Sequence, residues 1–137
     1  MLTRVRNHYL ESLDVMEVVR RACAEIMQEH GCGHTECVYE KLLSQYLYEK
    51  CVPFLTQVDC FIQKSDTQVH VGRIDMEIAH NTILELKVGA KVRLQDMEQL
   101  RKYVYAKRAC GMNVKNAAVI CFTTSGKVEI VQLQNRI

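Results

Sequence analysis

The sequence predicts a mixed α/β sandwich, in which helices cover a central sheet on both faces. Three observations lead to this fold class. Two segments near the N-terminus repeat apolar residues at helical spacing, five later segments read as strands, and one basic helix lies between the third and fourth strands. The element order is therefore α-α-β-β-β-α-β-β, and a sheet entered from two helical layers is typical of such a sandwich.

The first predicted helix covers residues 11–30. Apolar side chains recur at the spacing of helix turns, beginning with Leu13 and Met16, and give the helix one apolar face. Two glycines close together, Gly31 and Gly33, follow directly and are expected to end the helix.

The second predicted helix covers residues 34–50. Thr35 is expected to cap it, and Glu36 and Glu40 come early in the helix, where the macrodipole favours acidic groups. An acid at the start of a helix can serve as a cap or as a metal ligand, and the sequence leaves both roles of Glu36 open. The helix ends before Pro53.

Five runs of residues between turn signals predict the strands. They are expected at residues 54–63, 67–78, 82–88, 116–123 and 127–133. A basic helix over residues 93–110 separates the third strand from the fourth, and Gly111 ends it. Because no repeat or linker divides the chain, one domain over residues 1–137 is expected.

The hairpin over residues 72–88 carries the most information about function. If its turn centres on His80, Asp75 and Glu85 lie opposite each other, ~5 Å apart. Lys87 is two residues from Glu85 and shares that face. The opposite face is then apolar and consists of Ile74, Met76, Ile78, Leu84, Leu86 and Val88. This pattern supports the register, because a slip by one residue would bury the charges.

Two facing carboxylates repel each other, so a folded chain keeps them where water solvates them or where a cation bridges them. Carboxylates, a backbone carbonyl and waters are oxygen ligands that suit Mg²⁺ or Mn²⁺. A lysine on the same face can activate a water molecule or stabilise charge that develops on a phosphate. The pattern therefore indicates phosphodiester hydrolysis, although a solvent-exposed hairpin with mixed charges explains it equally well.

The charge of the chain is nearly balanced, but basic residues gather in one region. The formal net charge is +2, from 18 Lys and Arg against 16 Asp and Glu. From Lys87 to Lys115, eight basic residues stand against Asp96 and Glu98. Such a stretch can follow a phosphate backbone or form a solvated helix face.

Seven cysteines without a C-x-x-C pair indicate reduced thiols. Because Arg4, Arg6 and His8 precede any apolar run, no signal peptide is expected. We therefore expect an intracellular protein, located in the cytoplasm or the nucleus. No apolar run approaches the ~20 residues of a membrane span, so no membrane contact is expected. Cys37, with His34 nearby, is either a reactive thiol or a buried structural cysteine.

Several motifs together resemble a known nuclease family. The run from Gly31 to Leu43, with Gly33, Glu36 and Tyr39, resembles the signature of the GxxExxE family of the PD-(D/E)XK nuclease superfamily. The likeness covers roughly residues 12–133 and continues through Val52-Pro53-Phe54, Gln57, Val71-Gly72-Arg73-Ile74-Asp75 and Ile83-Leu84-Glu85-Leu86-Lys87. The pair Gln99 and Tyr103 is similar to the Q-x-x-x-Y motif of RecB-like nucleases.

The resemblance implies a restriction-endonuclease-like core with a mixed sheet of four to five strands. Asp75, Glu85 and the Leu86 carbonyl would bind Mg²⁺ or Mn²⁺, with Glu36 as a further ligand, and Lys87 would act on the attacking water. Gln99 and Tyr103 would support the site or contact the substrate. The residues expected to contact nucleic acid are Gln99, Tyr103, Arg73, Arg101 and Lys102.

The resemblance also implies a nucleic-acid substrate, and DNA is expected rather than RNA. It implies a role in DNA repair, recombination or replication. Exonuclease and endonuclease cleavage both stay open, and an exonuclease is one expectation. Small members often need a partner, a homodimer or other homo-oligomer, or a fused domain to hold a substrate. Only Cys110 and Cys121 lie late in the chain, so no iron–sulfur cluster is expected.

Two other functions stay open at this point. A chain that keeps the fold without catalysis would bind nucleic acid or a protein partner, and the small size and weak net charge agree with that. It would show no metal dependence, and Lys87→Ala would have little effect. An enzyme that depends on Cys37 would instead lose its activity when the thiol is alkylated, and a metal chelator would not change that activity.

Overall fold

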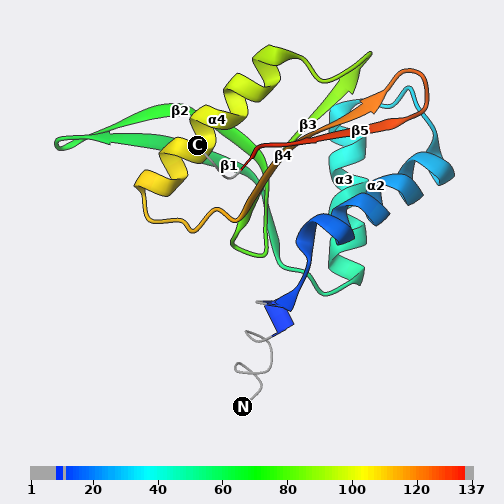
Figure 1. Cartoon of the computed structure of the whole chain (residues 1–137), viewed down its shortest axis with the longest axis horizontal. Coiled ribbons are helices and arrows are strands. Elements are labelled where there is room, and N and C mark those ends of the chain that lie inside the picture. Colours follow the sequence, from blue (N-terminus) through cyan, green and yellow to red (C-terminus); the bar gives the residue numbers. More distant parts are fainter. Residues whose placement is uncertain (1–8, 11, 135–137) are drawn as a thin grey trace.

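Helices lie on both faces of one five-stranded sheet in the computed structural model of the chain, which describes residues 9, 10 and 12–134 (Figure 1). The elements follow the order α2, α3, β1, β2, β3, α4, β4 and β5. The predicted α/β sandwich and its α-α-β-β-β-α-β-β order are confirmed. None of the helices in the described part of the chain has the length and apolar composition that crossing a membrane requires.

Helix α2 covers Val15–His30 and starts later than residue 11, where the sequence pattern placed it. The reason is Asp14, whose side chain accepts a hydrogen bond from the Glu17 backbone N–H and caps the helix. Residue 11 itself lies outside the described residues. The helix ends as predicted at Gly31, whose φ of 72° is unfavourable for other residues.

Helix α3 covers Glu36–Glu49 and is capped by Thr35, as its sequence predicts, because the hydroxyl accepts a hydrogen bond from the Val38 N–H. Tyr39 is fully buried and stacks on Phe122 of the sheet, with ring centroids 4.1 Å apart. Its hydroxyl donates to the Gly31 carbonyl at 2.8 Å. This one side chain therefore fixes the first turn of α3, and the acids on it, against the sheet.

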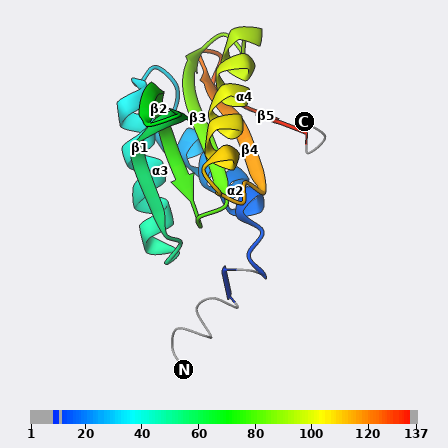
Figure 2. The ribbon, with the colours of Figure 1, turned by 90° about the vertical axis from the view of Figure 1, so that its left-hand side faces the viewer.

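The sheet is mixed, and its strand order is β1-β2-β3-β4-β5. The strands are β1 (Phe54–Lys64), β2 (Thr67–Ile78), β3 (Thr82–Gly89), β4 (Asn116–Thr123) and β5 (Val128–Gln132). Only β3 and β4 are parallel, and helix α4 (Leu94–Ala109) forms the crossover between them. Figure 2 shows α4 on one side of the sheet, with α2 and α3 on the other.

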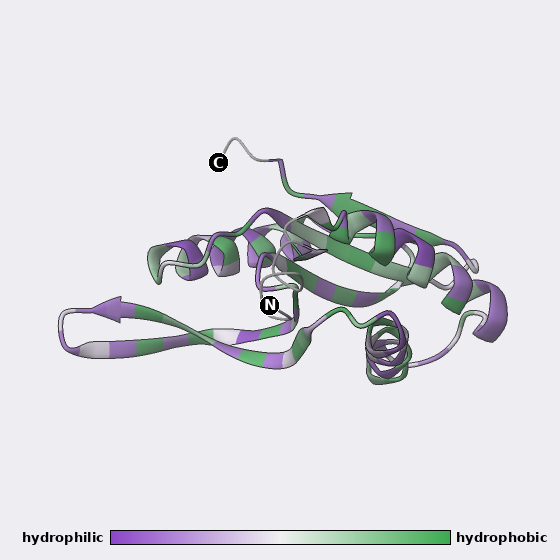
Figure 3. Cartoon of the chain, turned by 90° about the horizontal axis from the view of Figure 1, so that it is seen from below, coloured by the Kyte–Doolittle hydropathy of each residue, from purple (hydrophilic) through white to green (hydrophobic). Residues whose placement is uncertain are grey.

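The sheet forks between β2 and β3. Their pairing covers only residues 76–78 and 82–84, whereas β1 and β2 stay paired out to Lys64 and Thr67. Beyond the fork β1 and β2 continue as a long two-stranded ribbon that extends past the body of the molecule (Figures 1 and 3). Asp75 and Glu85 are the first residues past the last pair, so the fork opens at the two predicted catalytic acids.

The core has two parts, one on each face of the sheet. Met76, Ile78 and Leu84 pack under α2 and α3, whereas Ile74 and Ile83 pack under α4. The prediction that Ile74 shares a face with Met76 is therefore wrong. Past the Met76–Leu84 pair β2 stays paired with β1 but no longer with β3, and there Ile74 packs in the cluster that includes residues of α4.

Candidate active site

The register of the β2–β3 hairpin is the one that the sequence predicts. Met76 pairs with Leu84, and Ile78 pairs with Thr82. These pairs centre the turn on His80, and continuing the register by one residue brings Asp75 opposite Glu85. Both acids therefore lie at the mouth of the fork, where the strands separate.

Each acid is hydrogen-bonded to the strand of the other. The Leu86 N–H donates to Asp75 Oδ2 at 2.7 Å, and the Asp75 N–H donates to Glu85 Oε1 at 3.1 Å. If β2 and β3 stayed paired, backbone carbonyls would accept these hydrogen bonds. The two carboxylates accept them instead. Their orientation is set by the backbone, which is the rigid support that a reacting or metal-binding group needs.

Glu85 is unusual because it is an acid with only 2% of its surface exposed. Burial, followed by the neighbouring Asp75 carboxylate, raises the pKa of Glu85 from 4.5 to about 8. The Asp75 N–H and the Lys87 ammonium act in the opposite direction. Without a cation, Glu85 therefore holds a proton at neutral pH, and a bound cation would favour its charged form.

Lys87 is held at the site by a chain of side chains from α4. Its Nζ lies 3.4 Å from Gln99 Oε1, and Gln99 Nε2 donates to the Tyr103 hydroxyl at 3.0 Å. Tyr103 is buried and lies over Gly72, where an added Cβ would come within 2.5 Å of Oη. Tyr103 is buried, which favours the supporting role expected for it over contact with substrate.

A cavity of about 460 Å³ lies beside the acids and brings several of the predicted residues together. It is lined by Glu36, Cys37, Glu40, Gln57, Arg73, Asp75 and Leu86. Glu40 and Gln57 also line it, although the sequence analysis gave neither of them a role in the site. The four-residue spacing from Glu36 could have indicated Glu40, since it puts both acids on one face of α3.

The basic residues of α4 do not form one continuous surface. Arg101 and Lys102 are both exposed, but consecutive helix residues project ~100° apart. Arg101 lines a separate cavity with Val104, Tyr105 and others, whereas Lys102 follows Gln99 by three residues and shares its side of the helix. Lys107 forms an ion pair of 3.0 Å with buried Glu77 of β2. Of these side chains, Lys102 is therefore on the flank of α4 that carries Gln99.

Cys37 lies at the cavity and is exposed, so it is not the buried structural cysteine that was one of the two expectations. His34, the expected partner of a reactive thiol, has its Nε2 2.8 Å from the His30 carbonyl. The hydrogen bond of His34 thus goes to the backbone of α2.

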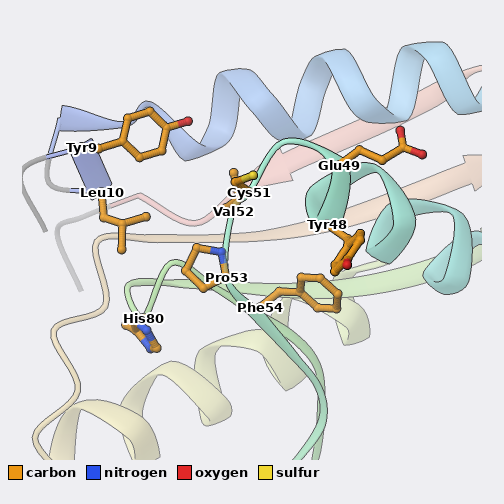
Figure 4. Close-up of a pocket in the computed structure, with 9 residues that line it drawn as sticks. All are labelled: Tyr9, Leu10, Tyr48, Glu49, Cys51, Val52, Pro53, Phe54 and His80. Carbon is orange, nitrogen blue, oxygen red and sulfur yellow. The ribbon is translucent and has the colours of Figure 1, made fainter. Parts of the chain in front are cut away.

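A larger cavity, of about 840 Å³, lies elsewhere and contains none of the predicted site residues (Figure 4). Its walls come from the N-terminal segment, the end of α3, the start of β1 and the β2–β3 turn. It is lined by Tyr9, Leu10, Tyr48, Glu49, Cys51, Val52, Pro53, Phe54 and His80. Size alone therefore does not identify the site in this molecule.

The residues at the fork are suited to a magnesium-like ion. Within the described ranges no group of three or more His, Cys, Asp and Glu is placed to hold a metal by itself. Mg²⁺, however, commonly uses one or two carboxylates and keeps several waters. Asp75, Glu85 and the Leu86 carbonyl supply only oxygen ligands, and a bound cation would oppose the rise that burial and Asp75 cause in the pKa of Glu85.

Comparison with known proteins identifies the family of the chain. A search of curated proteins and a search of solved structures returned no match. A scan against family models matched residues 13–133, a range that includes every element of the fold and every residue of the fork. On this match over nearly its whole length, the chain belongs to the PD-(D/E)XK nuclease superfamily.

Proposed function

We propose that this chain is a divalent-metal-dependent nuclease that hydrolyses phosphodiester bonds of DNA, and that it belongs to the GxxExxE group of its superfamily. The observation that carries this proposal is the pair of acids at the fork, each hydrogen-bonded to the strand of the other, with Glu85 buried. Burying an acid without an ion-pair partner destabilises a fold, so a hairpin with a purely structural role would not be expected to contain a residue such as Glu85.

Asp75, Glu85 and the Leu86 carbonyl would hold Mg²⁺ or Mn²⁺, with Glu36 of α3 as a further ligand. When bound, such an ion stabilises charge on a phosphate and lowers the pKa of a coordinated water. Lys87, two residues after Glu85, would orient the attacking water or stabilise the charge of the transition state. Gln99 keeps the Lys87 ammonium near the acids.

Arg73 and Lys102 are the basic residues proposed to contact the phosphate backbone. Arg73 lines the cavity with Asp75, and Lys102 lies on the flank of α4 that carries Gln99. We also propose an intracellular enzyme, because Cys32, Cys37 and other exposed cysteines are free thiols.

One observation favours a second candidate, a binding module that keeps the fold without catalysis. No group of three potential ligands is assembled in the described part of the chain. Such a module would bind nucleic acid or a protein partner without needing a metal.

The test is a calorimetric titration with Mn²⁺ and with Mg²⁺, made on wild type and on Asp75→Ala/Glu85→Ala. Each protein is then incubated with single- and double-stranded DNA and RNA. We expect metal binding and metal-dependent DNA cleavage by wild type alone. Lys87→Ala should keep the metal and lower the cleavage rate about 10²–10⁴-fold. Nucleic-acid binding without metal binding at millimolar concentration would identify the binding module instead.

A further inference from the structure

Gln57 has an unusual backbone and a position next to the catalytic acids. It lies in β1 between Thr56 and Val58, which pair with Met76 and Ile74 of β2. This register brings Gln57 opposite Asp75. Its φ is 53°, in the left-handed region, although it stands within a strand. For a residue with a side chain this conformation costs ~1 kcal/mol or more.

The strained backbone directs the side-chain amide between two acids. Gln57 Nε2 is 3.0 Å from Glu40 Oε1 on α3 and 3.4 Å from Asp75 Oδ1. Both carboxylates only accept hydrogen bonds, so the NH₂ end of the amide must face them. A neutral amide with two donors is thus placed where two negative charges would otherwise meet.

Asp75 has two oxygens with different partners. The Leu86 N–H bonds to Oδ2 at 2.7 Å, and the Gln57 amide makes the longer contact, at 3.4 Å, with Oδ1. The Gln57 amide limits how the carboxylate can rotate and so directs this oxygen.

The acids of α3 differ in how they are held. Three residues after Glu36 stands Tyr39, which is buried against Phe122, and the next acid is Glu40. Glu36 is exposed, while Glu40 is half-buried and connected through Gln57 to Asp75. Glu40 is thus the acid of α3 that is tied to the fork.

We propose that Gln57 and Glu40 are positioning residues of the metal centre. Gln57 fixes the orientation of the Asp75 carboxylate and couples it to Glu40, so that the acids of α3 and of the fork act as one unit. The backbone strain at Gln57 is retained because it aims the amide. This inference rests on the proposed metal-dependent function and gives a role in that site to two residues for which the family resemblance implied none.

The experiment separates backbone strain from the amide. Gln57→Gly removes both, so the variant should melt at the same or a higher temperature than wild type and yet bind Mn²⁺ about 10- to 100-fold more weakly. Ser65→Gly is the matched control, because Ser65 has the same φ of 53° but lies in the turn at the far end of the β1–β2 ribbon. It should relieve the same strain and leave Mn²⁺ affinity unchanged.

A double-mutant cycle with Glu40→Ala tests the coupling. If Gln57 and Glu40 act through each other, Gln57→Gly/Glu40→Ala should lose little more Mn²⁺ affinity than the more severe single variant. Unchanged affinity in Gln57→Gly, equal losses in Ser65→Gly, or independent losses that multiply in the cycle would each overturn the inference. In all three cases wild type still binds Mn²⁺ and cleaves DNA, so the proposed function stands. If wild type binds no metal, the proposed function and the positioning roles of Gln57 and Glu40 are both wrong.

Discussion

Among the single residues of the site, Glu85 is buried at an electrostatically unfavourable position. The metal-free protein keeps this carboxyl buried beside Asp75, and its pKa is raised to about 8. A bound cation removes the repulsion between them, so metal affinity and proton release are expected to be linked.

The pH dependence of stability follows from this pKa with a definite sign. In the unfolded chain Glu85 loses its proton near pH 4.5, whereas in the metal-free folded state it keeps it to about pH 8. Between these values the folded state binds more protons, so its stability falls as pH rises, by several kcal/mol over the window. Glu85→Gln keeps the acceptor oxygen and carries no charge. In EDTA it should match wild type near pH 4.5 and melt progressively higher than wild type toward pH 9.

Glu98→Gln, on the exposed face of α4, is the control for this experiment. It should change the melting curves little at any pH. Saturating Mn²⁺ should reverse the order of wild type and Glu85→Gln, because only wild type gains the binding energy of the ion. A stability difference that does not vary with pH would contradict the assignment of the raised pKa to Glu85.

The sequence predicts some site residues and not others, for a physical reason. Asp75, Glu85 and Lys87 can be found because the two-residue period of a strand decides which side chains share a face. Glu40 and Gln57 meet only after α3 has packed on the sheet and the Gln57 backbone has turned left-handed. No local pattern in the sequence encodes either event.

At the scale of elements, helix α4 joins the site to the fold. It supplies Gln99 and Tyr103 to Lys87, and its Lys107 pairs with buried Glu77 on β2. The helix thus contacts both arms of the fork. The position of this helix between the third and fourth strands was predicted from the sequence, because a basic helical segment ended by Gly111 separates the two strand segments.

The ion pair between Lys107 and Glu77 should be one of the main links between α4 and β2. Lys107→Met would leave the Glu77 carboxylate, which is only 10% exposed, without its cation. We expect a loss of about 3 kcal/mol in the free energy of unfolding and a melting temperature lower by about 10 °C.

Lys102→Met is the matched control, since Lys102 lies on the same helix and is exposed. Its effect should stay within about 0.5 kcal/mol. The pair is also tested by Glu77→Gln/Lys107→Met, which should recover part of the lost stability because no buried charge remains unpaired. Equal melting temperatures for Lys107→Met and Lys102→Met would show that the ion pair contributes nothing.

Element boundaries were less predictable than element order. The start of α2 depends on which polar residue caps it, and Asp14 takes that role. The face of Ile74 was mispredicted because the fork interrupts the pairing of β2 with β3. In the first case the apolar pattern continues before the residue that caps the helix. In the second it continues along β2 after the pairing with β3 has ended.

At the scale of the whole molecule, the charge distribution limits how nucleic acid can bind. The net charge is only +2, so a general attraction to a polyanion is weak. The eight basic residues from Lys87 to Lys115 are divided by their contacts. Lys107 is neutralised by Glu77, and Arg101 lies at a separate cavity with Tyr105. Few basic side chains therefore remain on the side of the fork.

The salt dependence of binding should reflect this division. With Lys87→Ala as the background, so that the substrate survives, DNA affinity is measured from 50 to 300 mM salt, roughly the range over which phosphate contacts weaken. Each lost phosphate contact lowers the slope of log K against log salt by about 0.9. Lys102→Ala should lose about one contact, whereas Arg101→Ala, on the other flank of α4, should keep the slope of the background protein. An equal loss in both variants would mean that the DNA crosses over α4 rather than along its Gln99 side. Binding that does not change with salt would remove the helix from the substrate path altogether, and the ribbon of β1 and β2 would then be the surface to test.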